Sequence, residues 1–275
     1  MANKLYLKGN NEMENKMLLD DTTILKLEDV DRRSYYAIKR FVDFTVSLLL
    51  LILLSPLMLV IALLIFIYSP GPIFFIQERV GAKRQYINGR LHWKKVPFYC
   101  YKFRTMKLNA DPAIHQAYVK ALIENDQSQM NALQNAPTVP HNPLSQAELT
   151  AMQDAPTIPR KLVNDSRIIG PGKLLRKLSL DELPQLWNVL LGDMSLVGPR
   201  PAIPYEVEMF KPWHLQRLKA QPGITGLQQV TARCSIDFDQ QIKLDIQYIE
   251  NQSIWLDLKI ILKTPFVMIS TKGAY

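Results

Sequence analysis

The longest apolar run in the chain covers residues 44–67, and it contains 24 positions without a charged side chain. At about 1.5 Å per residue, a helix of this length crosses a bilayer core of roughly 30 Å. A polar, charged lead, residues 1–38, precedes it and is too long for the start of an ordinary cleavable signal peptide. The pattern therefore predicts a retained membrane helix within residues 39–72.

A break inside this run favours a re-entrant helix. Ser55 and Pro56 lie near the middle, where a proline removes a backbone hydrogen bond and the serine hydroxyl can bond to the freed carbonyl. Cationic flanks tend to stay on the cytoplasmic side of a membrane. Both ends are basic here, with Arg32, Arg33, Lys39 and Arg40 before the run and Arg79, Lys83 and Arg84 after it. Both ends are therefore expected on one side, with a plain spanning helix as the alternative.

Two short apolar segments after the membrane helix predict strands. They cover residues 73–77 and 98–103, and they are rich in aromatic or β-branched side chains. The basic stretch 80–97 is expected to form a loop, with Asn88 and Gly89 as a hairpin turn signal. Strand content is expected to be small.

Helical patterns dominate the rest of the chain. An insertion at about residues 109–160, rich in Gln, Asn and Pro, opens with a proline-led helix over residues 111–124. Ser145 with Glu148 makes a capping box for a second helix, and a basic helix is expected over residues 173–177.

The last predicted helix covers residues 254–270 and carries an apolar stripe at helical spacing. Such a stripe belongs more often to the core than to a membrane contact, so we expect it to be buried. It consists of Trp255, Leu258, Leu262, Phe266 and Ile269.

Residues 179–201 combine two adjacent carboxylates, Asp181 and Glu182, with an apolar run and a Gly-Pro-Arg-Pro turn. One interpretation is structural: Ser179 caps a helix, Glu182 reaches back to the Ser179 amide, and Asp181 offsets the helix dipole. The other is chemical, because a helix N-terminus binds phosphate oxygens and an ionised Asp181 there can attack phosphorus. Glu182 could then bind Mg²⁺, which prefers one or two carboxylates together with substrate phosphates and water. The spacing alone is compatible with both.

Basic residues near turns could bind the phosphates of such a substrate. Each one alone is more often a solvated surface cation. Arginine nevertheless matches phosphate well, because its planar fork binds two oxygens at once. The candidates are Lys102, Arg104, Arg176, Arg200 and Arg233.

Composition narrows the range of partners. The 275-residue chain is 48% apolar, enough for a core, and its formal charge of +8 suits nucleic acid, an anionic membrane or phosphorylated substrates. The membrane helix favours the last two, and no segment is patterned to stack bases or to form a recognition helix. The two cysteines, Cys100 and Cys234, predict reduced thiols without a catalytic role.

Four motifs in order resemble the bacterial sugar transferases, the monotopic polyprenol-phosphate phosphoglycosyl transferases. They are SPGPIFFIQERVG, YKFRTM, SLDELPQLWNVLLGDMSLVGPRP and PGITGLQQV, and they follow the Ser-Pro-broken apolar run. The resemblance covers about residues 39–108 and again about residue 164 to the C-terminus. Several ordered motifs of this length are specific.

The resemblance implies transfer of a sugar 1-phosphate from a UDP-sugar to undecaprenyl phosphate, with release of UMP and with Mg²⁺ as cofactor. It implies that Asp181 is the nucleophile, that Glu182 is its metal-associated partner, and that both are metal-binding residues. Ser55 and Pro56 would form the break of a re-entrant helix, with the catalytic domain on the cytoplasmic face of the bacterial inner membrane. The positions linked to phosphate or nucleotide are Lys102, Arg176, Arg200 and Arg233, and Asp245 lies in a further recurring segment.

The expected fold is a helix-rich α+β domain with little strand, a re-entrant membrane helix and amphipathic interfacial helices. Residues 73–275 would form the cytoplasmic catalytic domain, and the long insertion departs from the family pattern. Membrane lipid and a second copy of the chain are further candidate partners. Two rivals remain: a membrane-anchored basic scaffold or lipid-binding protein without catalysis, and a transferase that works by direct displacement without a covalent intermediate.

Overall fold

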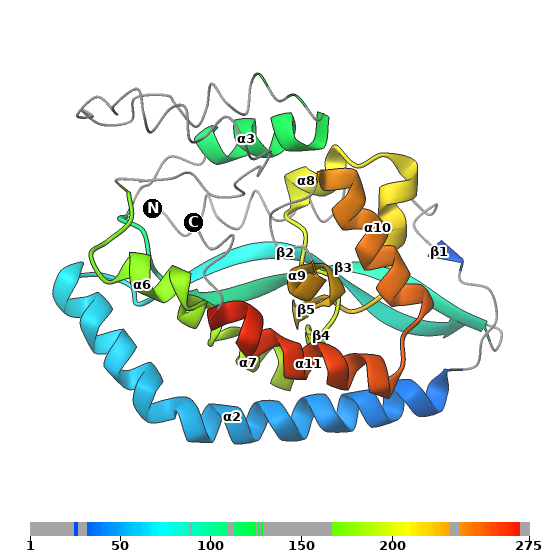
Figure 1. Ribbon diagram of the computed structural model, residues 1–275, viewed down its shortest axis with the longest axis horizontal. Coiled ribbons are helices and arrows are strands. Elements are labelled where there is room, and N and C mark those ends of the chain that lie inside the picture. The colour runs from blue at the N-terminus through cyan, green and yellow to red at the C-terminus, as the bar shows by residue number, and fades with distance from the viewer. Residues whose placement is uncertain are drawn as a thin grey trace.

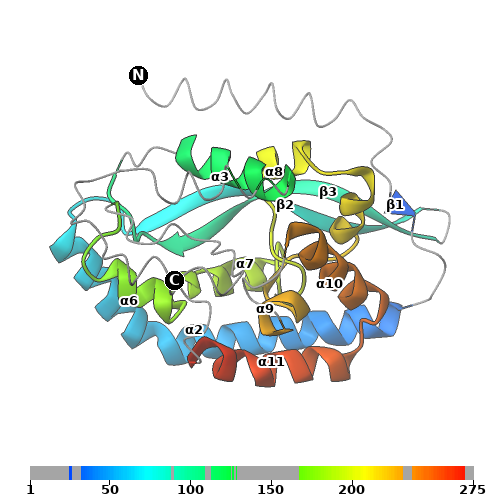
Figure 2. The ribbon, with the colours of Figure 1, turned by 45° about the horizontal axis from the view of Figure 1, so that its top comes forward.

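The computed structural model describes residues 25–26, 32–87, 90–108, 113–124, 126, 128, 167–231 and 237–269. Figures 1 and 2 show a helix-rich domain in which α7 lies between the long helix α2 and the β2–β3 hairpin. In chain order the elements are β1 (Leu25–Lys26), α2 (Arg33–Tyr68), β2 (Phe74–Ile87), β3 (Arg90–Phe103), α3 (Ala113–Glu124), α6 (Gly172–Lys177), the 3₁₀ helix η2 (Leu180–Glu182), α7 (Gln185–Leu191), β4 (Ser195–Val197), α8 (Pro204–Glu208), the 3₁₀ helix η3 (Pro212–Leu218), β5 (Gly223–Thr225), α9 (Leu227–Thr231), α10 (Phe238–Glu250) and α11 (Ile254–Ile269).

The hairpin is longer than the sequence predicted. β2 and β3 pair antiparallel from Phe74↔Phe103 to Ile87↔Arg90, and β1 adds a short third strand along β3. The predicted turn at Asn88 and Gly89 lies outside the described residues. The expected loop over residues 80–97 is wrong. It folds as strand because Ala82 and Trp93 are buried against Tyr36 of α2 in a small core of their own.

Helix α2 runs for 36 residues and continues through Pro56. The Ser55 hydroxyl donates to the Ile52 carbonyl at 2.8 Å, which is the carbonyl that Pro56 leaves without its usual amide donor. This confirms the expected role of the serine. In Figure 1 the ribbon of α2 bends upward in its C-terminal part.

The two halves of α2 differ in their surroundings. The first half buries polar side chains against the domain, among them Lys39, Asp43 and Ser47. The second half is apolar and largely exposed, apart from Ile61 and Ile65, which pack against Phe103, Ile169 and Leu175. Within the described part of the chain, α2 is the one helix long and apolar enough to cross a membrane.

The main core lies between α7, the hairpin, the β4–β5 pair and the helices α10 and α11. β4 and β5 pair in parallel, with Ser195 opposite Gly223 and Val197 opposite Thr225. Apolar side chains from these elements and from the first half of α2 surround this pair. A second core joins α3 to α10 through Val119, Ala121, Leu122, Ile123, Phe238 and Ile242.

The predicted helices have mixed outcomes. α3 and α6 confirm the expected helices near residues 111–124 and 173–177, whereas the capping box at Ser145 and Glu148 lies outside the described residues. Helix α11 confirms the C-terminal helix, but its expected burial is wrong. Four members of the stripe are exposed: Trp255 (74%), Leu258 (43%), Leu262 (59%) and Phe266 (75%). The core side of α11 consists instead of residues such as Asp257 and Ile260.

Candidate active site

The two predicted carboxylates lie beside β3. Glu182 accepts an ion pair from the Lys102 ammonium at 2.7 Å, and the two side chains are 31% and 20% exposed. Lys102 stands near the end of β3, opposite Phe75 of β2, and Glu182 ends η2. The structure therefore joins two motifs that lie 80 positions apart in the sequence. Asp181, the neighbour of Glu182, is partly exposed in the same 3₁₀ turn.

The predicted capping box is wrong. Ser179 has left-handed backbone angles, with φ 54° and ψ 23°, and its side chain makes no capping hydrogen bond. Its carbonyl instead accepts from the Glu182 amide at 3.2 Å, and α7 begins only at Gln185, after Pro184. Asp181 and Glu182 thus occupy a single 3₁₀ turn before the helix. The acid pair is not explained as a helix cap, and it precedes the α-helix instead of forming its first turn, which is where the phosphate hypothesis placed it.

Buried polar contacts fix α7 relative to its neighbours. The Asn188 side chain, which is fully buried, donates to the Tyr99 carbonyl at 2.7 Å and accepts from the Tyr101 amide at 3.1 Å. From the other side, Arg40 of α2 donates to the Val189 and Leu190 carbonyls at 2.6 and 2.7 Å. Because these carbonyls end the helix, the arginine serves as a C-terminal cap. The acid pair is held by both the hairpin and the long helix.

The pleat of the hairpin aligns further groups with Lys102. Side chains two positions apart share a face of a sheet, and directly paired residues share it too. Gln77 is paired with Cys100, so Gln77, Arg79, Cys100 and Lys102 lie on one face. Burial raises the pKa of the Cys100 thiol, which agrees with an unreactive cysteine.

Arg79 is the residue of this face that the sequence analysis missed, because it counted only as one flanking charge of the membrane segment. The side chain is 5% exposed. Burial, followed by the positive charge of Arg200, lowers the pKa of the Arg79 guanidinium, whereas Glu206 and Glu182 act in the opposite direction. These electrostatic partners place Arg79 among the groups of the site. The alternation in Phe-Ile-Gln-Glu-Arg could have signalled it, since Gln77 and Arg79 are two positions apart.

Arg200 projects from the Gly-Pro-Arg-Pro turn after β4 and is exposed. Close backbone packing fixes this turn against the segment before β5. A Cβ on Gly198 would lie 2.3 Å from the Gln221 carbonyl oxygen, and one on Gly223 would lie 2.1 Å from the Gly198 amide nitrogen. Both positions therefore require glycine. Two of the recognised motifs, VGPRP and PGITG, meet here as neighbouring backbone.

The other predicted phosphate-binding residues have different settings. The Arg104 guanidinium donates to the Ser69 carbonyl at the end of α2 and is 4% exposed, so its visible role is to cap that helix. Asp245 is buried and forms an ion pair with Arg217 at 2.7 Å. Arg176 lies in α6, and its carbonyl accepts from the Ser179 amide. Arg233 lies outside the described residues. Substrate contacts for these four residues remain predictions.

Asp181 and Glu182 could bind a metal ion only if a substrate supplied further ligands. Within the described ranges, no group of three or more His, Cys, Asp or Glu side chains could hold a metal ion. Asp181 and Glu182 supply two adjacent carboxylates, and Mg²⁺ is commonly held by one or two carboxylates plus substrate phosphates. The residues therefore fit Mg²⁺ bridged to a phosphorylated ligand and do not form an all-protein cage.

Comparisons with known proteins agree with these motifs. A family model described as bacterial sugar transferase matches residues 34–271. The undecaprenyl-phosphate galactose phosphotransferase of Salmonella typhimurium is 36% identical over 93% of this chain and 45% of that protein. The galactosyl transferase CpsE of Streptococcus agalactiae is 41% identical over 74% of this chain and 36% of that protein. The exopolysaccharide production protein ExoY of Sinorhizobium fredii is 34% identical over 86% of this chain and 88% of that protein. The chain thus spans less than half the length of the first two relatives and most of the third.

Proposed function

Because this chain belongs to the bacterial sugar transferase family, we propose that it transfers a sugar 1-phosphate from a UDP-sugar to undecaprenyl phosphate and releases UMP. The names of two relatives support this substrate pair: the undecaprenyl-phosphate galactose phosphotransferase above, and a UDP-glucose:undecaprenyl-phosphate glucose-1-phosphate transferase of Klebsiella pneumoniae. Such a transfer is the first membrane step in assembling a cell-surface glycan.

One observation carries the proposal most directly. The Lys102–Glu182 contact at 2.7 Å brings the acid pair to a sheet face that also holds Arg79, with Arg200 as an electrostatic neighbour. A carboxylate pair surrounded by cations suits a substrate that is itself an anion, because the cations offset the charge of its phosphates. The absence of a capping role for Ser179 removes the structural explanation of the acid pair.

In the proposed reaction, Asp181 acts as the nucleophile. Its carboxylate oxygen forms a bond to the phosphorus that carries the sugar, and the bond from that phosphorus to the bridging oxygen of UMP breaks. UMP leaves with the electron pair. An oxygen of undecaprenyl phosphate then attacks the same phosphorus, the bond to Asp181 breaks, and the free carboxylate is restored.

The neighbouring residues would hold charge and geometry during both steps. Lys102 keeps Glu182 oriented, and Arg200 is exposed at the end of a rigid turn, where it can contact phosphate oxygens. Asp181 and Glu182 would hold Mg²⁺ together with the phosphates of the donor. When bound, the ion would neutralise phosphate charge and make UMP a better leaving group.

The membrane placement that we propose is re-entrant, on the cytoplasmic face of the inner membrane. At the start of α2, Arg32 donates to the Ile249 and Glu250 carbonyls at 2.9 and 2.7 Å. Near its other end, Ile61 and Ile65 pack against Phe103 of the same domain. If α2 crossed a bilayer core of roughly 30 Å, its two ends would lie on opposite sides of the membrane, and only one of them could contact the domain. Contacts at both ends support a helix whose two ends stay on one side.

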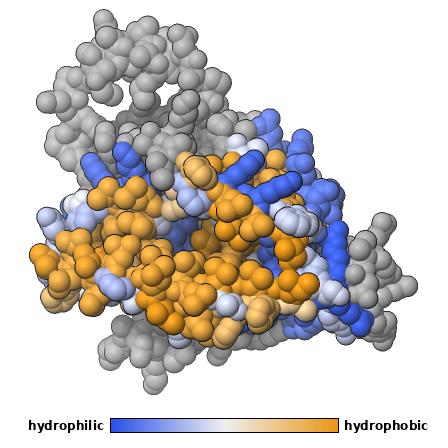
Figure 3. All heavy atoms as spheres, turned by 60° about the horizontal axis from the view of Figure 1, so that its bottom comes forward, coloured by the Kyte–Doolittle hydropathy of each residue, from blue (hydrophilic) through white to orange (hydrophobic). Residues whose placement is uncertain are grey.

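A broad apolar face supports the same placement. Figure 3 shows apolar residues gathered on the face that comes forward when the bottom of Figure 1 is turned to the viewer. In Figure 1, α2 and α11 lie along this side of the molecule, and both carry exposed apolar side chains, Trp255 and Phe266 of α11 among them. An exposed apolar face of this extent is typical of a membrane contact. The α11 stripe would thus lie at the interface, and the acceptor phosphate would meet the site at headgroup height.

Turnover of the purified protein tests the function. The protein in detergent or vesicles is given a panel of UDP-sugars, with and without undecaprenyl phosphate, and UMP release is followed. We expect release with at least one UDP-sugar and incorporation of labelled sugar phosphate into the lipid. A folded protein that binds vesicles but releases no UMP with any donor would support the scaffold alternative.

Labelled donor separates the covalent route from direct displacement. With donor alone, the covalent route predicts a label that stays on the wild-type protein after denaturation and is absent from Asp181→Asn. Direct displacement predicts UMP release only when the acceptor is present, with no labelled protein at any time.

A further inference from the structure

Two buried arginines hold the turn that presents Arg200. Arg79 Nη1 donates to the Pro201 carbonyl at 3.0 Å, and Arg217 Nη2 donates to the preceding carbonyl, that of Arg200, at 3.2 Å. Their side chains are 5% and 7% exposed. One turn thus receives two guanidinium groups on successive carbonyl groups, from β2 and from η3.

The charges of the two arginines are balanced differently. Arg217 forms an ion pair with Asp245 at 2.7 Å, and this aspartate is 2% exposed. Arg79 makes its other hydrogen bond to a neutral group, the Gln77 amide oxygen, at 2.6 Å. Among the described residues, the buried Arg79 Nε has no hydrogen-bond partner. No described carboxylate forms an ion pair with Arg79, so its charge is not neutralised by direct contact.

A purely mechanical role does not account for this arginine. The Val80 amide already donates to the Ala202 carbonyl at 2.9 Å, which ties β2 to the segment after the turn. A buried charge is costly to keep unless an opposite charge or several hydrogen bonds offset it. A neutral side chain of similar size could have filled the same position beside this backbone bridge without that cost. The retained charge therefore points to an anion that the site receives.

The setting of Arg79 identifies the chemistry of that anion. Arg79 shares a sheet face with Lys102, which pairs with Glu182, and it holds the turn of Arg200. We propose that Arg79 is a further positioning residue of the active site: it fixes the Arg200 turn and supplies interior positive charge that the phosphates of the bound donor neutralise. This inference rests on the proposed function, because the donor there is a nucleoside diphosphate sugar. Arg79 acts by holding the turn and by its electrostatic effect on the site, and it needs no direct contact with the substrate.

Binding of UDP compared with uridine tests the proposal without requiring turnover. The two ligands share the nucleoside and differ in the phosphates, so the ratio of their affinities measures how much the phosphates contribute to binding. We expect Arg79→Gln, which removes the positive charge, to weaken the binding of UDP by about tenfold or more while the binding of uridine changes little. Arg79→Lys, which keeps the charge, should recover a large part of the loss. Lys243→Met, which removes an exposed cation of α10, is the matched charge control and should leave the ratio unchanged.

The outcomes separate this inference from the proposed function. A folded Arg79→Gln protein with an unchanged UDP-to-uridine ratio overturns the role of Arg79, even if the wild type transfers sugar phosphate. If Arg79→Gln does not fold, Arg79→Lys decides: an unfolded or equally impaired lysine variant shows that shape, not charge, is required. A wild-type protein that binds UDP in an Arg79-dependent way but transfers no sugar phosphate supports Arg79 and refutes the function.

Discussion

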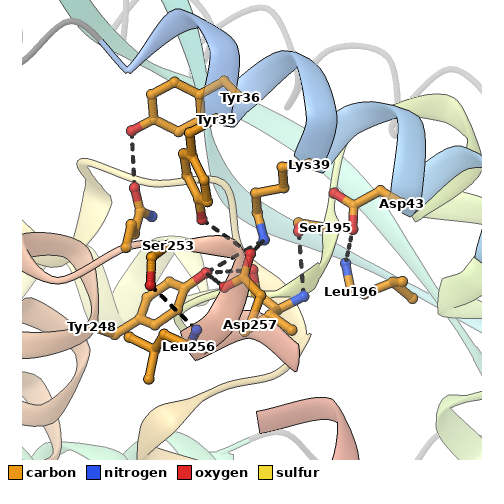
Figure 4. A network of polar contacts seen from close by, with 12 residues as sticks. Tyr35, Tyr36, Lys39, Asp43, Ser195, Leu196, Tyr248, Ser253, Leu256 and Asp257 are labelled. Atoms are coloured by element: carbon orange, nitrogen blue, oxygen red, sulfur yellow. Dashed lines mark hydrogen bonds and ion pairs between the residues drawn. The ribbon is translucent and has the colours of Figure 1, made fainter. Parts of the chain in front are cut away.

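The N-terminal part of α2 and the candidate active site balance their buried charges in opposite ways. At the N-terminal part of α2, the Asp257 carboxylate accepts hydrogen bonds from Lys39 at 2.7 Å, from Tyr248 at 2.7 Å and from Tyr35 at 3.0 Å, as Figure 4 shows. We call these four residues the anchor network. The Lys39 and Asp257 side chains are each 9% exposed, and their charges cancel. Burial, followed by the charge of Asp257, raises the pKa of the Tyr248 hydroxyl well above its ordinary value, so this hydroxyl stays a donor.

In the candidate active site, the charges are paired less completely. Lys102 and Glu182 pair while remaining partly exposed, Arg200 is exposed, and Arg79 is buried without an ion-pair partner among the described residues. The difference teaches how to separate structure from function in this chain. The anchor network, in which the charges of Lys39 and Asp257 cancel, holds α2 to α10 and α11. The candidate active site is partly exposed and carries surplus positive charge, which suits an anionic ligand.

The largest effect should come from Asp181, the proposed nucleophile. Asp181→Asn is expected to lower UMP release by at least about a thousandfold, because a covalent route loses its attacking group. Stability should change little, within about 0.5 kcal/mol, since the residue is partly exposed and its turn is not a capping box. Rates of UMP release and thermal unfolding of the same preparation are measured together.

Asp193→Asn is the matched control for this prediction. Asp193 lies in the same motif and pairs with Lys83 at a partly exposed 3.4 Å contact. Its amide variant should keep near wild-type activity, with a stability loss below about 1 kcal/mol. Comparable activity losses in both variants would contradict a special role for Asp181.

The anchor network should show the reverse pattern, with a stability loss and little change in chemistry. Lys39→Met leaves the Asp257 carboxylate buried without its cation, which is expected to cost about 3 kcal/mol of unfolding free energy. Thermal unfolding in detergent measures the loss, and UMP release per folded molecule should stay close to wild type.

The double variant Lys39→Met with Asp257→Asn is the control for this loss. It removes both charges, and the amide keeps an oxygen that can accept from one of the two tyrosine hydroxyls and an NH₂ group that can donate to the other. Most of the lost stability should return. If the double variant is as unstable as the single one, the uncompensated charge is not the cause.

The sequence predicted the helices and strands better than it predicted the difference between the anchor network and the candidate active site. The apolar run, the bond from Ser55 to the helix, α3, α6 and α11 all follow from local patterns. The strand character of residues 80–97 did not, because it depends on Ala82 and Trp93 reaching Tyr36 of α2. The burial of the α11 stripe was wrong for a related reason. An apolar face at helical spacing does not state whether protein or lipid covers it.

For the candidate active site, the sequence identified the two acids and two of the cations but not the residues that hold them in place. Asp181, Glu182, Lys102 and Arg200 stand in recognisable motifs. Arg79, Asn188 and Arg217 act through backbone carbonyls of distant segments, and no spacing along the chain reports such contacts. Ser179 fitted the capping pattern, yet its backbone is left-handed and its side chain makes no capping hydrogen bond.

Substitutions in the exposed stripe of α11 should have an effect of intermediate size, on membrane binding. Trp255→Ser combined with Phe266→Ser should weaken partition into vesicles by about thirtyfold, or about 2 kcal/mol, because two large apolar side chains are lost from the proposed membrane contact. The thermal midpoint in detergent should stay unchanged, since both side chains are at least 74% exposed. Exchange of the protein between two vesicle populations measures the effect. Lys259→Ser, an exposed position on the same helix, is the control, and equal weakening by it would contradict a membrane contact.

The smallest effects should come from two serines, one in each region. Ser253 accepts from the Leu256 amide at 3.3 Å at the start of α11, so Ser253→Ala should cost about 1 kcal/mol of unfolding free energy through the lost cap. Ser179 makes no such bond and holds φ at 54°, a conformation that glycine adopts without strain. Ser179→Gly should therefore be neutral or stabilising by about 0.5 kcal/mol, and Ser179→Val should be destabilising by about 1 kcal/mol or more. Thermal unfolding of the three variants checks the order. A loss on Ser179→Gly as large as that on Ser253→Ala would mean that the Ser179 hydroxyl supports the acid pair after all, and the structural explanation of Asp181 and Glu182 would return.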